Sequence, residues 1–546
     1  MKPRLHNQSA QDRHSWVRPQ PIETGSSVPT IMLRMEDGQP RATGDAQAFI
    51  GCRQEFAGDS RPRGLFASWS WDGETLTAEV DPLGFFSLFV YSHGDCVGLS
   101  PSLLHLVAAG AETVVDPVAV AVFHRLGMFV NDDTPFRQIR TLPPGGRLRW
   151  KAGRLEITGG FLSPKTQSMS RSAAVEAFIE LPRASLRRFL DHWAGQIALP
   201  LSGGRDSRHI LFELHHQRRL PETCVTFHHG GRSLNAEVQA ARAIAARVGV
   251  RHTVLGHPRA RMRDQIRGLL LTQLCADEHA QMMPLHDFFN NQPVAALDGI
   301  GGDILTNPDN SAAGFMALSQ KGDFSGIARG MMRGHADVLS RPGHEGGAGS
   351  LLSPDLHEAA VDRVARAVAQ HADAPDPYQA FWFWHRTRRE INFVPTAILA
   401  SAAAVYCPYL DPDMVELGLS LPWSITCDQK LHDDAIARAF PDFADVPFSE
   451  GFVSQALPAT RLHKVRSVVD SLAIALSVEP DRPLGAIADV LGGSPSQLKR
   501  SVADVYRLHG RLIAQMDAPG ARRLISLGHR LASAAGDPVY EVIDAP

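Results

Sequence analysis

Cysteine is scarce in this chain, and its copies are widely separated. Among 546 residues there are six cysteines, with no Cys-x-x-Cys pair and no set of cysteines and histidines at the close spacing of a structural zinc site. A structural zinc site uses such close spacing, so the sequence argues against one. We expect the six side chains to be reduced thiols in the protein core: Cys52, Cys96, Cys224, Cys275, Cys407 and Cys427.

Long hydrophobic runs are also missing. No stretch approaches about 18 consecutive apolar residues, the length that spans a membrane. Residues 1–28 are polar and charged, and they lack the apolar centre of a signal peptide. These features predict a cytoplasmic protein that has no membrane partner and begins with a loose arm over residues 1–28.

Neither sign of charge is in large excess. The chain has 55 lysines and arginines against 58 aspartates and glutamates, a net charge of −3 with the 24 histidines neutral. Neither sign is gathered in a tail, which argues against nucleic acid as a partner. Hydrophobic residues at 44% and charged residues at 21% are typical of a folded chain, and the length predicts more than one domain.

The apolar pattern changes near residue 165. Over residues 29–165, short apolar runs alternate with Asp-Gly and Pro-Pro-Gly turns, which predicts a β-rich domain. After a helical stretch, residues 195–201 predict a short buried strand that ends in a glycine loop. Short strands then alternate with helices, which is typical of a parallel sheet. The predicted fold class is therefore α/β, with a second domain over residues 166–546 whose C-terminal part is mostly helical.

The glycine loop carries the clearest chemical signal. The predicted strand runs into Ser202, Gly203 and Gly204, and a helical pattern begins at Asp206 and Ser207. Backbone N–H groups of such a loop and a helix N-terminus converge on an anion, so the segment predicts a phosphate cradle. The lysine of a Walker-A loop is missing, which argues against transfer of a γ-phosphoryl group.

Two arginines flank this loop, and their roles stay open. Arg205 and Arg208 either contact phosphates or are solvated residues at the start of the helix.

A second glycine turn supplies another carboxylate. The segment Leu297-Asp-Gly-Ile-Gly-Gly-Asp follows a predicted strand and ends at Asp303. An Asp-Gly turn by itself is more often a plain loop, but here it is paired with the first loop. Mg²⁺ in phosphate sites takes one or two carboxylates together with phosphate oxygens. We therefore predict that Asp206 and Asp303 are the metal ligands and take part in catalysis.

Together the two loops resemble the synthetase domain of the asparagine synthetase family (class B-like). In that family a Ser-Gly-Gly-x-Asp-Ser loop is followed by a Gly-x-Gly-[Ser/Gly]-Asp loop, and residues 235–252, 407–417 and 430–441 are similar to further family segments. The resemblance implies an N-type ATP pyrophosphatase domain, with ATP and Mg²⁺ as cofactors. It also implies that adenine lies near Leu201, Phe227 and Gly299. The predicted nucleotide-binding residues are Leu201, Ser202, Gly203, Gly204, Asp206, Ser207, Phe227 and Gly299.

The N-terminal part is similar to the glutaminase domain of that family, an Ntn-hydrolase sandwich. The similar segments include residues 64–72 and 134–145. The family's glutaminase uses an N-terminal cysteine whose free amine activates the thiol, whereas this chain begins with Met1 and its Cys52 and Cys96 are internal. The resemblance therefore implies a catalytically silent domain, as in β-lactam synthetases and lasso-peptide cyclases.

The acceptor side departs from the family pattern. Ile300 stands where the family has glutamate or tyrosine, and Ser449 stands where it has a basic residue. Each candidate replacement also has an ordinary structural interpretation, on the surface or in the core. The candidates for a general base are His385, Glu390 and Tyr406, and those for the basic residue are Lys430, Arg386, Arg388 and Arg389.

These motifs predict an ATP-dependent, AMP-forming ligase that makes an amide bond without glutamine. The substrate is a small molecule or peptide that carries the carboxylate and the amine, as in lactam or macrolactam formation in natural-product biosynthesis. A protein that delivers a precursor peptide is a candidate partner. Two alternatives stay open: an ammonia-dependent enzyme similar to asparagine synthetase, and a pseudoenzyme that binds nucleotide or a partner without turnover. The predicted catalytic residues are Asp206, Asp303, Lys430, Tyr406 and Glu390.

Overall fold

The computed structural model describes most of the chain. The described residues are 28–54, 61–227, 233–256, 261–290, 292–306, 311–339, 354–453, 455–456, 461–478, 483–484, 487, 502–533 and 542–544. The predicted N-terminal arm, apart from Val28, lies outside these residues.

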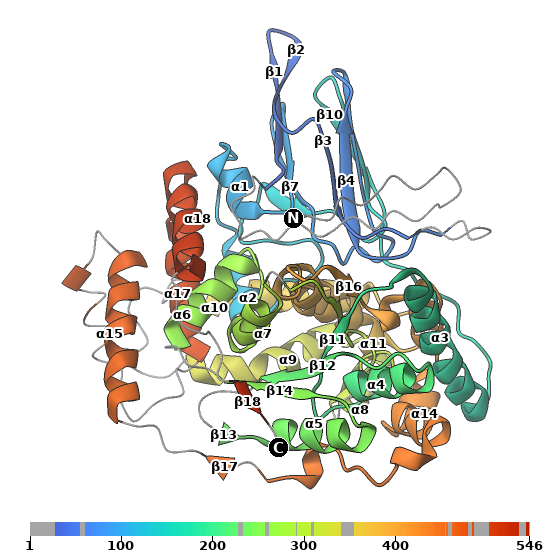
Figure 1. Ribbon diagram of the computed structural model, residues 1–546. Coiled ribbons are helices and arrows are strands. Elements are labelled where there is room, and N and C mark those ends of the chain that lie inside the picture. Colours follow the sequence, from blue (N-terminus) through green and yellow to red (C-terminus); the bar gives the residue numbers. More distant parts are fainter. Residues whose placement is uncertain are drawn as a thin grey trace.

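Two antiparallel five-stranded sheets form the N-terminal part (Figure 1). The first has the order β2-β1-β7-β6-β8 and the second the order β10-β9-β5-β4-β3. The strands of the first sheet are β1 (Ile31–Glu36), β2 (Gln39–Gly44), β6 (Phe89–His93), β7 (Cys96–Ser100) and β8 (Ile139–Thr141). Those of the second are β3 (Gln47–Gly51), β4 (Phe66–Trp71), β5 (Thr75–Val80), β9 (Arg147–Lys151) and β10 (Arg154–Thr158).

The two sheets share one hydrophobic core. Successive side chains of a strand point to opposite faces, so every second residue faces the partner sheet. Ile31 and Leu33 of β1 accordingly lie in one buried cluster with Leu76 and Ala78 of β5. The prediction of a β-rich N-terminal part is confirmed, since strands β1 to β10 all lie within residues 31–158.

A six-stranded sheet forms the centre of the rest of the chain. Its order is β16-β15-β11-β12-β14-β18, and all neighbours pair in parallel except β18, which is antiparallel at one edge. The mixed α/β class with a parallel sheet is thus confirmed. The strands are β11 (Ile197–Pro200), β12 (Thr223–Phe227), β14 (His252–Leu255), β15 (Ala295–Leu297), β16 (Ala404–Tyr406) and β18 (Val542–Asp544); a separate pair joins β13 (Ser233–Leu234) to β17 (Gln455–Ala456).

Helices cover both faces of this parallel sheet, which explains why most residues of its inner strands are buried. Leu199 of β11 packs with the first group of helices, whereas its neighbour Ala198 packs with the second. The first group is α3 (Arg171–His192), α4 (Asp206–His216), α5 (Ala236–Val248), α12 (Pro412–Ser420) and α14 (Leu431–Ala439). The second is α6 (Arg261–Leu271), α7 (Met283–Phe289), α17 (Val502–Ala514) and α18 (Ala518–Ser533).

Further helices complete the fold around these layers. They are α1 (Leu103–Ala108), α2 (Pro117–Leu126), α8 (Ala312–Ser319), α9 (Phe324–Leu339), α10 (Pro354–Ala369), α11 (Pro377–Trp382), α13 (Trp423–Thr426) and α15 (Arg461–Val478), with π-helical turns at Phe383–Ile391 and Val394–Ile398. From residue 354 onward most of the described elements are helices, in agreement with the predicted helical character of the C-terminal part.

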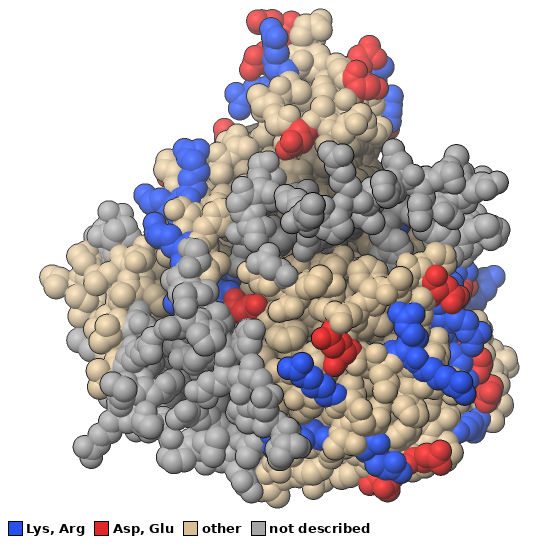
Figure 2. All heavy atoms as spheres, viewed as in Figure 1, with Lys and Arg blue, Asp and Glu red and all other residues tan. Residues whose placement is uncertain are grey.

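The surface and the helices carry two further observations. On the face shown in Figure 2, basic and acidic side chains are interspersed in small groups. Among the described residues, no helix is both long enough and apolar enough to cross a membrane.

Candidate functional site

The two glycine turns meet at the point where the order of the parallel strands reverses. From β11 the chain continues to β12 and β14 on one side, whereas β15 and β16 lie on the other side. Loops that follow two such neighbouring strands diverge to opposite faces and leave a crevice at their carboxyl ends, where ligands bind in open α/β sheets. The turns after β11 and β15 are the two predicted from the sequence.

Close backbone approach joins the turns. The Asp303 N–H donates to Asp206 Oδ2 over 3.1 Å. A Cβ placed on Gly302 would stand 2.6 Å from Asp206 Oδ1, and one on Gly299 would stand 2.7 Å from Asp206 Cβ. Only glycine at both positions lets the second turn lie against the first aspartate.

A cavity of about 390 Å³, named the main cavity because residues of both glycine turns line it, opens beside the turns. Most of the predicted nucleotide-binding residues line it, together with Asp303 and Ile300. Gly203 and Gly204 are not among its lining residues. The predicted residues at the cavity are Leu201, Ser202, Asp206, Ser207, Phe227 and Gly299.

The first loop holds its own amides and hydroxyls in place. Ser207 Oγ accepts from the Ser202 N–H over 3.0 Å, and Ser202 Oγ accepts from the Gly204 N–H over 3.2 Å. The Gly203 N–H donates over 3.1 Å to the carboxylate of Glu237, a cavity residue on α5 that the sequence interpretation left out. A carboxylate on this amide shows that the loop can bind an anion.

Gly203 has a reason of its own to be glycine. A Cβ there would stand 2.8 Å from Ser449 Cβ and 3.0 Å from Ala240 Cβ. The residue therefore lets α5 and the Ser449 turn pack closely against the loop.

The charges of the site favour a bound cation. Burial, and then the nearby charge of Asp303, raise the pKa of Asp206 well above its ordinary value. Burial also raises the pKa of Asp298, a third carboxyl at the cavity, to about 6. A cation beside these carboxyls would offset the burial and the negative charge that disfavour their ionised forms. Carboxylate oxygens are also the ligands that Mg²⁺ prefers. The residues present therefore fit a divalent cation.

His432 is another site residue that sequence reasoning missed. It is fully buried on α14, and its Nδ1 lies 3.4 Å from Asp206 Oδ1. The residue lies two positions after Lys430, but no spacing in the sequence connects it to the glycine turns.

A buried chain of polar groups continues behind His432. Its Nε2 lies 3.1 Å from Nδ1 of His209, and burial lowers the pKa of both histidines, so both rings are neutral. His209 Nε2 faces Glu213 at 3.9 Å, and Glu213 forms an ion pair with Arg183.

The two arginines of the first loop point away from the cavity. Arg205 pairs with Asp433 of α14 over 2.5 Å. The buried guanidinium of Arg208 donates to the carbonyl oxygens of Val446 and Pro447, each over 2.7 Å. Both side chains therefore anchor the segments around the loop.

The candidate basic residues are separated by the structure. Arg386 lines the cavity, and Lys430 is exposed at the start of α14 and is not among the lining residues. Arg388 donates to the backbone carbonyl of Asn131 over 2.7 Å. The fully buried Arg389 donates to the backbone carbonyl of Asp133. Of the four candidates, the cavity therefore contains Arg386.

The candidate bases lie behind the cavity wall. Glu390 is buried and pairs with Arg386 over 3.2 Å, and burial followed by the charge of Glu278 raises its pKa well above the ordinary value. Tyr406 is buried with its hydroxyl on Ser185, and His385 Nδ1 accepts from the Asn131 N–H over 2.9 Å. None of the three is among the cavity's lining residues.

The cysteine prediction is correct in part. All six thiols are free, and four of them are buried. Cys96 is half-buried and Cys427 is exposed, because Cys427 ends the short helix α13 at the surface. The expectation of six core thiols is therefore wrong for these two residues.

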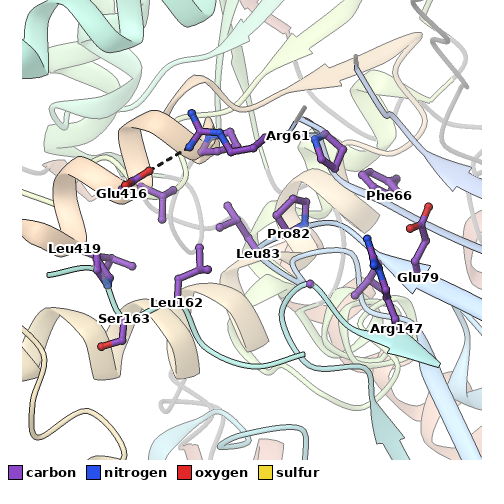
Figure 3. A pocket seen from close by; sticks show the side chains of 16 residues that line it. Arg61, Phe66, Glu79, Pro82, Leu83, Arg147, Leu162, Ser163, Glu416 and Leu419 are labelled. Atoms are coloured by element: carbon purple, nitrogen blue, oxygen red, sulfur yellow. Dashed lines mark hydrogen bonds and ion pairs between the residues drawn. The ribbon is translucent and has the colours of Figure 1, made fainter. Parts of the chain in front are cut away.

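A second cavity, of about 520 Å³, lies between the N-terminal sheets and α12 (Figure 3). Leu83 and Leu162 point into it, and Arg61 donates to Glu416 at its rim over 3.1 Å. It shares no lining residue with the first cavity and contains neither glycine turn. The two glycine turns therefore belong to the first cavity alone.

Comparison with known proteins adds no relative. No family model matches the chain, and a search of curated proteins found no match. The interpretation of the site depends on its own residues and geometry.

Proposed function

We propose that this protein is an ATP-dependent carbon–nitrogen ligase. The observation that carries the proposal is the contact between the two glycine turns, where the Asp303 N–H donates to Asp206 Oδ2 at the wall of the main cavity. The resemblance of both turns to the asparagine synthetase family supports the same activity.

The proposed reaction has two steps. A carboxylate oxygen of the substrate forms a bond to the α-phosphorus of ATP, and the bond between that phosphorus and the β-bridging oxygen breaks to release pyrophosphate. An amine nitrogen then forms a bond to the acyl carbon, AMP leaves, and the amine proton passes to a base. Holding both reactants in one cavity supplies much of the rate acceleration.

The chain's own residues supply donors for the phosphates. The Gly203 N–H, which donates to Glu237, is available to a phosphate oxygen once that carboxylate moves, and Ser202 and Ser207 add hydroxyl groups. Arg386 brings positive charge to the cavity wall. A divalent cation held by Asp206 and Asp303 would offset the charge of the departing pyrophosphate.

The substrate itself supplies the amine in this proposal. A glutaminase that uses an N-terminal cysteine needs the free amine of that cysteine. Cys52 and Cys96, the cysteines of the N-terminal part, each have a peptide nitrogen instead. Burial also raises the pKa of Cys52 to about 12, which keeps it a thiol at neutral pH. Apolar cavity residues such as Met282 and Leu285 fit a substrate with a hydrophobic part, as in lactam or macrolactam formation.

The nucleotide products test the proposal. Candidate acids are screened by ATP–pyrophosphate exchange, and the products of the best one are separated by chromatography and weighed by mass spectrometry. We expect AMP and pyrophosphate in equal amounts, because the bond that breaks lies between the α- and β-phosphates. ADP and phosphate as the main products would contradict the mechanism, and nucleotide binding without turnover would identify a pseudoenzyme.

The two aspartates provide a matched test of the site. Asp206→Asn and Asp303→Asn each remove one charge with little change in volume, so we expect loss of pyrophosphate release in a protein that stays folded. Asp445→Asn is the control, because that side chain is 71% exposed and is not among the residues that line the cavity. Near-normal turnover in either site variant would remove that residue from the metal site.

A further inference from the structure

Three side chains from three different segments converge beside the main cavity. Asp206 begins α4, Asp303 ends the second glycine turn, and His432 lies in the first turn of α14. One ligand atom from each lies within 4.8 Å of the other two. Adjacent ligands of one ion at about 2.1 Å are separated by about 3 Å, so the three atoms would have to approach one another by up to about 2 Å to share one ion.

Two of these ligand atoms are buried and lack a hydrogen-bond partner among the described residues. They are Asp206 Oδ1 and His432 Nδ1, which face each other at 3.4 Å. Buried polar atoms are normally hydrogen-bonded, and each exception requires an explanation such as an absent ion. A cation between them would satisfy both atoms.

The hydrogen bonds behind His432 suit a metal ligand. A ligating imidazole binds the ion through one nitrogen and donates its other N–H to an acceptor. If Nδ1 is the ligand, the Nε2–H donates to Nδ1 of His209, at 3.1 Å. The N–H of His209 is then on Nε2, 3.9 Å from the carboxylate of Glu213, which is longer than a hydrogen bond. This assignment of protons accounts for the hydrogen bond between the two histidines.

We infer that Asp206, Asp303 and His432 form one metal site, with two oxygen ligands and one nitrogen ligand, which binds Mn²⁺ more tightly than Mg²⁺. The inference builds on the proposed function, since the same two aspartates hold the metal of that reaction. Mg²⁺ prefers oxygen ligands, whereas a transition-metal ion gains from an imidazole nitrogen. The histidine is what distinguishes this site from a pair of carboxylates.

Pulsed electron paramagnetic resonance of the full-length wild-type protein with Mn²⁺, in the absence of nucleotide, tests the ligand set directly. We expect a modulation from a directly bound nitrogen nucleus. Mn²⁺ that binds without nitrogen modulation, or no Mn²⁺ binding at millimolar concentration, would overturn the inference. This measurement needs no variant and so does not depend on whether a variant folds.

Variants then assign the nitrogen. In His432→Asn the nitrogen ligand is lost, and we expect the affinity for Mn²⁺ to fall about 10- to 100-fold while the affinity for Mg²⁺ changes little. His209→Asn should lower the affinity for Mn²⁺ about 10-fold through the lost acceptor. The control is His124→Asn, which breaks a second buried histidine pair, His124 with His509, and should leave metal binding unchanged. Equal loss of both metals in His432→Asn would show a structural role only.

Failure of this inference is distinct from failure of the proposed function. Formation of AMP and pyrophosphate with Mg²⁺, together with no nitrogen modulation, would overturn the histidine ligand alone. Nitrogen modulation together with no nucleotide turnover would overturn the ligase alone.

Discussion

At the scale of single residues, the glycines of the second turn determine how close the two aspartates come. A Cβ on Gly302 would stand 2.6 Å from Asp206 Oδ1 and 2.7 Å from its Cγ, closer than real side chains approach. The carboxylate of Asp206 would have to move away, and the Asp303 N–H that donates to it would lose its acceptor. Adding a single methyl group at position 302 would therefore push the two glycine turns apart.

Gly302→Ala is the resulting prediction. We expect turnover to fall about 100-fold, because a displacement of about 1 Å in a catalytic group has an effect of that size. The rate of AMP formation measures it. Gly160→Ala is the matched control, since a Cβ there has no atom within 4 Å, and it should retain normal turnover. Equal rates in the two variants would show that the turn tolerates a side chain.

At the scale of elements, the π-helical segment Phe383–Ile391 distributes its arginines between two tasks. Arg386 reaches the cavity and pairs with Glu278 and Glu390 at 3.2 Å each. Arg388 and Arg389 point to the N-terminal part and donate to backbone carbonyls at residues 131 and 133. The wider turn of a π-helix lets neighbouring arginines leave the segment in different directions.

The prediction for this element is that Arg386 acts in the site and Arg388 in the fold. Arg386→Gln should lower the rate of AMP formation about 100-fold, since it removes one charged donor from the cavity. It should also lower the melting temperature, since the buried Glu390 loses its ion pair. Arg388→Gln should lower the melting temperature and leave the rate of the folded protein near normal. Nucleotide analysis and calorimetry of both variants measure this.

Two further variants control this comparison. Arg366→Gln, on the exposed face of α10, should change neither quantity. The other is the double variant Arg386→Gln/Glu390→Gln, which also removes the carboxyl group that pairs with Arg386. The double variant should not regain activity. Recovery of activity in that double variant would assign the defect to Glu390.

At the scale of the whole molecule, buried neutral histidines make stability depend on pH. His509 is fully buried, donates to Leu274 O over 2.8 Å and lies 3.1 Å from His124. Burial lowers its pKa from 6.5 to about 4, so the unfolded chain binds more protons between these values. The stabilisation is present above pH 6.5 and is lost as the pH falls toward 4. Burial also lowers the pKa of His105, His209, His252, His279 and His371 to about 3 or 4.

Buried carboxyl groups with raised pKa values, among them Asp206, Glu390, Asp81 and Asp298, act in the opposite direction. Burial raises the pKa of Asp81 and Asp298 to about 6, so the folded state binds more protons than the unfolded chain between about pH 4 and 6. Their contribution becomes more favourable as the pH falls. The histidines outnumber them, so the net effect of acid is destabilising.

We therefore predict that the protein loses stability between about pH 7 and pH 5, and that His509→Gln reduces this loss by about 2 kcal/mol. Denaturant unfolding at the two pH values measures it. His93→Gln, at an exposed side chain, serves as the control and should keep the dependence of the wild-type protein. An unchanged dependence in His509→Gln would show that folding does not lower the pKa of this ring.

Local sequence patterns were enough to predict the glycine turns. A strand, two glycines and a helix start lie within a few consecutive residues, and the structure has β11 and α4 on either side of Ser202–Arg205. The residues that line the cavity from these turns could be named for the same reason. Backbone geometry over such a short span depends mostly on neighbours in the sequence.

Contacts between distant segments were decided by the tertiary structure alone. The strand order places the loops after β11 and β15 side by side, α14 brings His432 to within 3.4 Å of Asp206, and the π-helical segment turns Arg386 into the cavity while Glu390 stays behind it. No local pattern specifies such contacts, because they depend on how helices from separate parts of the chain pack on the two faces of one sheet. The sequence by itself therefore determined the two glycine turns and the polar residues that they carry. The direction and burial of each long side chain were determined by packing.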